Sequence, residues 1–381
     1  MKALLALLLT AVISCLITAA QTAEEVKPLT EKPLVQMAIL LDTSNSMDGL
    51  IEQAKAQLWN IVSEFAVAKR NGITPDLHVA LYQYGNDNIP ASEGHIRLMA
   101  PLTNDLDKIS EELFALKTCG GQEYCGMVIK HATENLEWSK SNDVYKVIFI
   151  AGNEPFTQGS VNYKEACEAA IAKGIIVNTI HCGSEQDGIN GKWKDGADLA
   201  DGKYMIIDHN SAVVHIDAPQ DAEIIRLSEE LNKTYIPFGK EGKKGALNQI
   251  EQDMNASKYG DSYVAQRAII KSKEVYNNAS WDLVDAVNHS NLKLENVDEK
   301  ELPENMQKMT KEEREKYVTS QNEARKKFQE QINKLNNERG KYIAEETKKL
   351  KEKGENTLGV NIINTIREQA EKKNFEFKQE K

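Results

Sequence analysis

Short, nearly continuous apolar runs alternate with amphipathic stretches along the first two thirds of the chain. Apolar runs without polar interruption predict strands that are buried on both faces, and apolar residues that recur every three or four positions predict helices. The predicted strands are 34–41, 77–84, 96–102, 144–151, 175–181 and Tyr204–Ile207, and the predicted helices are 50–69, 105–116, 124–138, 163–173 and 219–231. Strands that alternate with helices predict an α/β fold with a doubly wound, mostly parallel sheet over residues 34–238.

The pattern becomes less regular in one insertion and after residue 238. Residues 184–202 are rich in Gly and Asp, and we expect a surface insertion in the first half and a short helix in the second. A Gly- and Lys-rich joint then leads into a predicted helical segment, 246–300. The sequence therefore predicts an α-helical C-terminal extension behind the α/β domain.

Charged residues dominate from residue 303 onward. Thr310 and Glu313 have the spacing of a capping box, which predicts the start of a long, charged amphipathic helix within 303–354, followed by a tail, 355–381. Its apolar seam is thin and includes Phe328, Ile332 and Leu335. The seam fits a solvated helix, and it also allows helix-mediated self-association of the coiled-coil type.

The first 20 residues have the pattern of a secretory signal peptide. Lys2 precedes an apolar run that ends in small residues at Ala20, and the following residues are polar. The alternatives to a cleaved signal peptide are an uncleaved membrane anchor and a lipid attached to Cys15. We therefore expect an exported protein, periplasmic, secreted or lipid-anchored to the envelope, with no transmembrane span after signal removal.

Removal of the signal would leave four cysteines, an even number that is compatible with two disulfides in an exported chain. Four cysteines allow three pairings. Proximity in the sequence favours Cys119 with Cys125 and Cys167 with Cys182. Buried free thiols are the alternative.

The formal net charge of −11 argues against nucleic-acid binding as the main task. Contacts with phosphates require a basic face. The same charge favours the attraction of cations.

The polar segment directly after the first predicted strand contains Asp42, Ser44 and Ser46 at alternating positions. Alternation in an extended turn directs their oxygens to one side. A carboxylate with two hydroxyls is a hard-oxygen set that suits Mg²⁺, Mn²⁺ or Ca²⁺. The carboxyl ends of strands in open α/β sheets are also where ligands bind. A polar turn that only caps a helix is the alternative.

This motif resembles the opening of the metal-ion-dependent adhesion site of von Willebrand factor A (VWA) domains. The resemblance covers residues 34–238 and implies two companion loops, at Gly120-Gly121 and after the strand 144–151. The Thr and Asp that the family carries in these loops are missing here. Glu123, Asn153 and Glu154 are the nearest oxygen donors that could replace them.

The resemblance implies an exported, bacterial, non-catalytic interaction module with a partly degenerate adhesion site. A divalent cation would be presented to an acidic group on a protein or glycan partner. One alternative is a metal-independent structural or assembly protein of the cell envelope. A hydrolase that uses Asp42, Glu123 and a metal is a more distant one.

Overall fold

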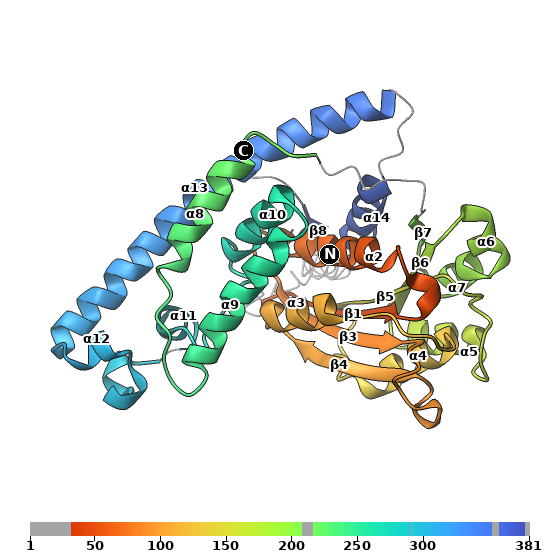
Figure 1. Ribbon diagram of the computed structural model, residues 1–381, viewed down its shortest axis with the longest axis horizontal. Coiled ribbons are helices and arrows are strands. Elements are labelled where there is room, and N and C mark those ends of the chain that lie inside the picture. Colours follow the sequence, from red (N-terminus) through yellow and green to blue (C-terminus); the bar gives the residue numbers. More distant parts are fainter. Residues whose placement is uncertain (1–31, 208–215, 291, 353–357, 378–381) are drawn as a thin grey trace, which may run out of the picture. The chain divides into compact units, whose positions relative to one another are not determined.

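The computed structural model of the protein describes residues 32–207, 216–290, 292–352 and 358–377. The expected signal peptide and Cys15 lie outside the described residues, as do parts of the expected tail. The predicted sheet is present, with the strand order β4-β3-β1-β5-β6-β7 (Figure 1). All neighbours pair in parallel except β3 and β4, which are antiparallel. The strands are β1 (Leu34–Asp42), β3 (Asp76–Tyr84), β4 (Ile96–Thr103), β5 (Tyr145–Gly152), β6 (Ile175–Cys182) and β7 (Tyr204–Ile207).

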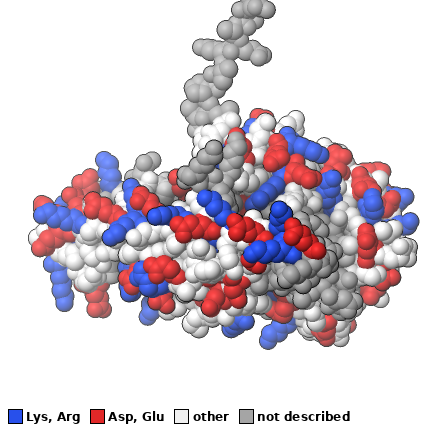
Figure 2. Space-filling model, turned by 90° about the horizontal axis from the view of Figure 1, so that it is seen from above, with Lys and Arg blue, Asp and Glu red and all other residues white. Residues whose placement is uncertain are grey.

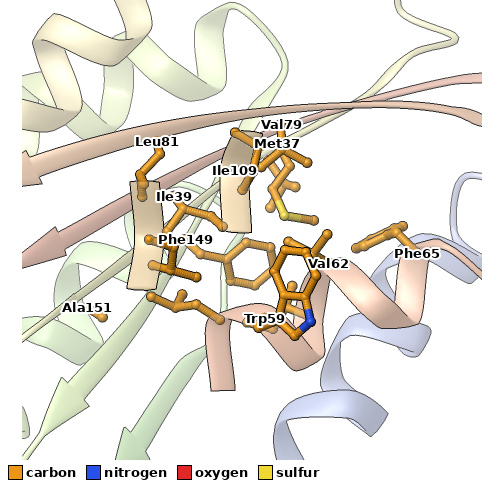
Figure 3. Close-up of a cluster of buried hydrophobic side chains, with 14 of the residues drawn as sticks. Met37, Ile39, Trp59, Val62, Phe65, Val79, Leu81, Ile109, Phe149 and Ala151 are labelled. Carbon is orange, nitrogen blue, oxygen red and sulfur yellow. The ribbon is translucent and has the colours of Figure 1, made fainter. Parts of the chain in front are cut away.

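Helices cover both faces of this sheet because its central strands are apolar on both sides. Met37 and Ile39 of β1 pack on one face with Trp59 and Val62, as Figure 3 shows, whereas Leu40 packs on the other. Burial of such a side chain contributes about 1.5–3 kcal/mol. Helices α2 (Ile51–Phe65) and α3 (Leu106–Ala115) supply the first face, and α4 (Cys125–Asn135), α5 (Tyr163–Ala172) and α7 (Trp193–Leu199) supply the second.

The insertion after β6 differs from the prediction in its first half. That half is helical, α6 (Glu185–Asn190), and α7 follows it. Ser184 caps α6 by accepting a hydrogen bond from the backbone N–H of Asp187. The helix packs closely on His181, and a Cβ at position 188 would lie 2.7 Å from the ring. This contact explains why a glycine, which favours helices poorly, stands at this position.

From residue 216 onward, the described residues are mainly helical, as predicted. The long helix α13 begins with the expected capping box: Thr310 N donates to Glu313 Oε2 at 2.8 Å, and Glu313 N donates to Thr310 Oγ1 at 3.3 Å. Its seam packs inside the same chain, because Ile332 lies in one cluster with Leu227 of α8 and Ala265 of α10. The helices are α8 (Asp221–Asn232), α9 (Gly242–Ser257), α10 (Asp261–Lys271), α11 (Leu283–His289), α12 (Glu304–Gln307) and α13 (Lys311–Glu352).

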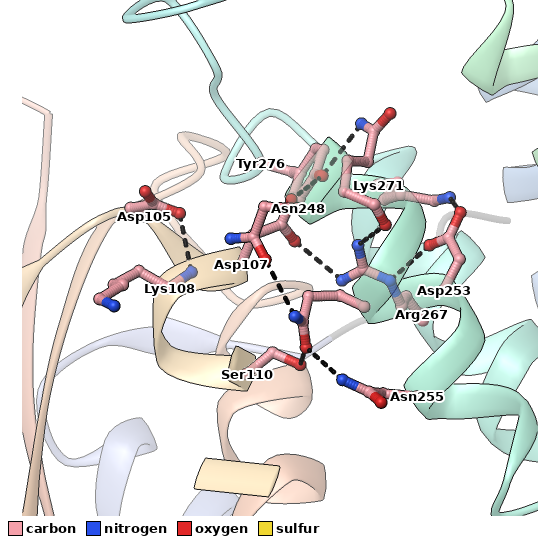
Figure 4. Close-up of polar contacts among 12 residues, drawn as sticks. Asp105, Asp107, Lys108, Ser110, Asn248, Asp253, Asn255, Arg267, Lys271 and Tyr276 are labelled. Carbon is pink, nitrogen blue, oxygen red and sulfur yellow. Dashed lines mark hydrogen bonds and ion pairs between the residues drawn. The ribbon is translucent and has the colours of Figure 1, made fainter. Parts of the chain in front are cut away.

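A buried ionic network joins this helical region to α3. Asp107 of α3 accepts hydrogen bonds from Arg267 of α10 at 2.9 Å and from the Tyr276 hydroxyl at 2.6 Å, as drawn in Figure 4. Arg267 and Lys271 also contact Asp253 of α9. These two cations hold the pKa of Asp253 down at about 2 despite its burial. The helical region is therefore attached to the α/β domain by specific contacts.

The C-terminal segment returns to the sheet, which the sequence does not predict. Helix α14 (Leu358–Glu371) packs beside α2, and Ile366 and Phe375 are buried in the core on that face. Gln369 and Asn178 of β6 exchange two amide hydrogen bonds of 2.9 Å. Strand β8 (Phe375–Glu376) pairs with β2 (Lys69–Arg70) in antiparallel fashion. Residues more than 150 positions beyond β7 thus complete the hydrophobic core.

The surface drawn in Figure 2 carries basic and acidic side chains intermixed, without an extended region of one sign. Within the described residues, no helix combines the length and the apolar character that a bilayer span requires.

Candidate metal site

The turn after β1 brings the three predicted oxygen donors together. Asp42 Oδ1 accepts a hydrogen bond from the backbone N–H of Ser44 at 2.8 Å, which closes the turn. The hydroxyls of Ser44 and Ser46 are 2.8 Å apart. None of these side chains caps the short 3-10 helix that follows, Asn45–Met47. These oxygens lie together at the carboxyl edge of the sheet, directly after β1.

Asn153 joins this group from the loop after β5. Its Oδ1 accepts a hydrogen bond from Ser46 Oγ at 3.0 Å, and its Nδ2 donates to the Ser46 carbonyl at 2.9 Å. Parallel pairing of β1 with β5 places the two loops side by side. The side chain of Asn153 therefore lies within hydrogen-bond distance of Ser46.

Glu123 reaches the same cluster from the loop before α4. It is only 4% exposed, and its carboxylate interacts with the Ser44 side chain. Its backbone N–H donates to Gln158 Oε1 at 2.6 Å, which fixes the loop. Glu154 is less central. Its carbonyl accepts a hydrogen bond from the Trp193 indole, and its carboxylate acts on Glu123 through its charge.

Two glycines, one directly after β3 and one at the end of β5, leave room for the Asp42 carboxylate. A Cβ at Gly85 would lie 2.6 Å from Asp42 Oδ1, and a Cβ at Gly152 would lie 3.1 Å from Oδ2. Asp42 is fully buried, and its Oδ2 has no hydrogen-bond partner. A buried carboxylate oxygen without a partner is costly. A cation would satisfy such an oxygen.

The electrostatics of the cluster also favour a cation. Burial raises the pKa of Asp42 well above its usual value, and the charge of Glu123 raises it further. Burial likewise raises the pKa of Glu123, with contributions from the charges of Glu154 and Asp87. Carboxylates that repel one another at short range become stable together when a cation lies between them.

The donor set fits a hard divalent cation. Asp42, Ser44, Ser46, Glu123 and Asn153 would hold it through carboxylate, hydroxyl and amide oxygens. Within the described residues, no three His, Cys, Asp or Glu side chains form a metal-binding group. The fit therefore depends on the serine and asparagine oxygens as well as the carboxylates. A bound cation would supply a positive centre with positions left for water or a partner's oxygen.

Sequence analysis missed the contribution of the loop after β3. Asn86 Nδ2 donates to the Thr43 carbonyl at 3.2 Å and to the Lys117 carbonyl at 3.1 Å, and so it joins the first and second site loops. The Asp87 side chain lies at the rim, 60% exposed. The sequence offered one signal, a Gly-Asn-Asp run directly after a buried strand.

The prediction of two disulfides is wrong, because the four cysteines among the described residues are free thiols. Cys167 packs on the α4 and α5 face of the sheet, whereas Cys182 packs on the α2 face, so the sheet separates them. Cys125 begins α4 in the core, with its sulfur 3.8 Å from the Tyr84 hydroxyl, whereas Cys119 N donates to the Thr43 carbonyl at the site. Glu123 is therefore positioned by Gln158 and not by a disulfide.

Comparison with known proteins assigns the domain. Residues 36–192 match the family model of the von Willebrand factor type A domain. A stretch of 174 residues, 44% of this chain, is 26% identical to the collagen alpha-2(VI) chain of Gallus gallus. The match spans 16% of that protein, so this chain corresponds to a small part of it.

Two solved structures illustrate the range of similar proteins. The protein BatB from Bacteroides thetaiotaomicron is 19% identical, with 46% of this chain and 90% of that chain covered and a TM-score of 0.36. Proximal thread matrix protein 1 from the mussel byssus, described with zinc in its adhesion-site motif, is 13% identical, with 48% and 43% covered and a TM-score of 0.36. From the family match and the strand order, we conclude that the chain contains a von Willebrand factor type A domain, with Asp42 at the carboxyl edge of its sheet.

Proposed function

We propose that this protein is a cation-dependent binding module whose partner contacts the carboxyl edge of the sheet. The observation that carries the proposal is the buried Asp42 carboxylate, with one oxygen unpartnered, beside the hydroxyls of Ser44 and Ser46. A divalent cation would satisfy that oxygen and leave coordination positions for water and for a partner. VWA domains generally act as interaction modules, which favours binding over catalysis as the role of this site.

Isothermal titration of the protein with Mg²⁺, Mn²⁺ and Ca²⁺ tests this proposal. We expect at least one cation to bind at a single site and to raise the melting temperature. At a cation concentration 100 times the Kd, the stabilisation would be about 2.7 kcal/mol. Asp42→Asn preserves the size of the side chain and its bond to Ser44 N, and we expect it to abolish binding.

The control is Asp198→Asn, because Asp198 lies far along the chain in an exposed pair with Lys194. This variant should bind the cation as the wild type does. Wild-type protein that shows neither heat of binding nor a thermal response to any of the three cations would refute the proposal.

We further propose that the protein is exported, with cleavage after Ala20. The support is the charge and hydropathy pattern of residues 1–20. Expression of the full chain with mass spectrometry of the exported product tests this. The expected N-terminal residue is Gln21, whereas a lipid on Cys15 or an intact Met1 would contradict it.

A further inference from the structure

The charge of the candidate site bears on the kind of partner that it can bind. The resemblance to adhesion sites implies an acidic partner group, which must be attracted by a centre with surplus positive charge. Here Asp42 and Glu123 supply two carboxylates to the cluster. Glu154 directly follows Asn153, whose side chain is bonded to Ser46, and a Cβ at Gly120 would lie 3.0 Å from Asp87 Oδ2 and 3.6 Å from Asn45 Nδ2. The charges of Glu154 and Asp87 also act on Glu123 and raise its pKa. Two carboxylates already balance the charge of one divalent cation, so the further charges of Asp87 and Glu154 leave the loaded site with a surplus of negative charge.

The surrounding protein does not offset this surplus with basic side chains. In the part of the chain that the structure describes, no Lys or Arg forms an ion pair with Asp42, Asp87, Glu123 or Glu154. Among the ion pairs of the described residues, these four carboxylates take part in one, in which His95 Nδ1 lies 3.9 Å from Asp87 Oδ1. A carboxylate of a partner would therefore meet repulsion from the rim, and like charges brought together across an interface cost several kcal/mol.

The positions of these groups divide the site into a centre and a rim. Asp42 and Glu123 are buried, and their carboxylates lie with the Ser44 hydroxyl. Asp87 and Glu154 come from two different loops, after β3 and after β5, and are more exposed. The centre can hold a cation, while the rim remains free to contact a partner.

We infer that the partner presents a neutral oxygen, such as a backbone carbonyl or a hydroxyl, to the cation, and basic side chains to Asp87 and Glu154. The partner surface is thus a basic protein segment, not an acidic one. This inference rests on the proposed function, because it assumes a loaded site. It differs from the expectation based on the family in one respect, the charge of the partner surface.

The first test asks whether the loaded site accepts a carboxylate. Mn²⁺ is added to the protein, and the relaxation rate of water protons reports how many waters remain on the ion. Acetate and acetamide are then titrated as matched probes. We expect acetamide to displace water at least as well as acetate. The variant Asp87→Asn/Glu154→Gln, which removes the rim charges, should improve acetate binding by about fivefold or more.

The second test asks whether the rim attracts basic surfaces. Binding is measured to sensor surfaces of poly-L-lysine and poly-L-glutamate in Mn²⁺ over a series of salt concentrations. We expect binding to poly-L-lysine, which the rim variant weakens by about fivefold. The variant Glu134→Gln/Asp198→Asn removes the same number of charges from exposed positions elsewhere and should change binding less than about twofold.

The outcomes separate the inference from the proposed function. Protein that binds neither Mn²⁺ nor the other two cations refutes the proposed function itself. Protein that binds Mn²⁺ but takes acetate more tightly than acetamide overturns the inference alone. Equal losses of poly-L-lysine binding in the rim and control variants would also overturn it, because net charge would then explain the effect.

Discussion

Asp42 is a buried acidic residue whose charge destabilises the fold. Its carboxylate is fully buried and lies in a space that two glycines leave open. Burial raises its pKa, so in the cation-free protein the charged form is disfavoured. Because the folded pKa lies above the unfolded one, this group weakens the cation-free protein as the pH rises through that interval. A bound cation would remove this cost.

The effect of His181 on stability has the opposite pH dependence to that of Asp42. Both ring nitrogens are buried without hydrogen-bond partners, and burial lowers the pKa of the ring, with the charge of Asp187 acting in the other direction. The neutral ring packs against Trp193, which in turn donates to the Glu154 carbonyl. The residue therefore supports the third site loop in its neutral form.

We predict that His181 makes the fold sensitive to acid. The unfolded chain gains a proton near pH 6.5, before the folded protein does, so stability falls as the pH drops below this value. Each unit between the two pKa values corresponds to about 1.4 kcal/mol. Urea unfolding between pH 7.5 and 5.5 should show a smaller loss for His181→Leu than for the wild type. The exposed control His289→Gln should keep the wild-type slope, and an unchanged slope in His181→Leu would contradict the prediction.

Contacts between elements explain how the helical region is held on the domain. Asp107 of α3 is 4% exposed and pairs with Arg267 of α10, which is 3% exposed. Removing one partner of a buried ion pair leaves the other charge uncompensated. The contact to Asp253 remains and reduces the effect.

We predict that Asp107→Asn destabilises the protein by about 3 kcal/mol, at the lower end of the range for broken buried pairs. The control is Asp105→Asn on the same helix. Asp105 caps α3 by accepting a hydrogen bond from Lys108 N, and Asn is an equally good cap, so we expect little change. Chemical denaturation measures both. A loss below about 1 kcal/mol in Asp107→Asn would mean that the network does not hold the two regions together.

Pattern and motif predict individual elements well when their cause is local. The strands were predicted from apolar runs such as that of β1, and the start of α13 was predicted from the spacing of Thr310 and Glu313. Helix α6 was missed because Gly188 and its neighbours have low helix propensity, and its close packing on His181 is a tertiary effect. The expected disulfides failed because sequence distance carries no information about which face of a sheet a cysteine occupies.

At the scale of the whole molecule, the domain is discontinuous in sequence. Helix α14 and strand β8 complete the core beside α2, although α8 to α13 intervene. Nothing in the local pattern of 358–377 predicts which surface it covers, because Asn178 of β6, the amide partner of Gln369, lies 191 residues earlier. The contacts that hold the site loops also join residues that are distant in the sequence. Asp42 was recognisable by its motif, whereas Gln158 and Asn86 act only through the fold.

We predict that the C-terminal segment is required for a stable domain. Deletion of residues 358–381 would expose the surface that Ile366, Ala370 and Phe375 cover and leave Asn178 without its amide partner. The loss should exceed about 3 kcal/mol, since removal of one large core side chain alone costs that much. Thermal unfolding with a dye for exposed apolar surface measures it. Deletion of 378–381 is the control, and equal melting temperatures of the two truncations would contradict the prediction.

Anomalous diffraction from crystals soaked in Mn²⁺ would show directly whether a cation binds at the turn after β1. We expect one ion at the carboxyl edge of the sheet, ligated by oxygens from Asp42, Ser44 and Ser46, with Glu123 or Asn153 in its coordination shell. The same soak of Asp42→Asn should show no peak there. A well-ordered wild-type site without an anomalous peak, or an ion bound only elsewhere on the chain, would contradict the account.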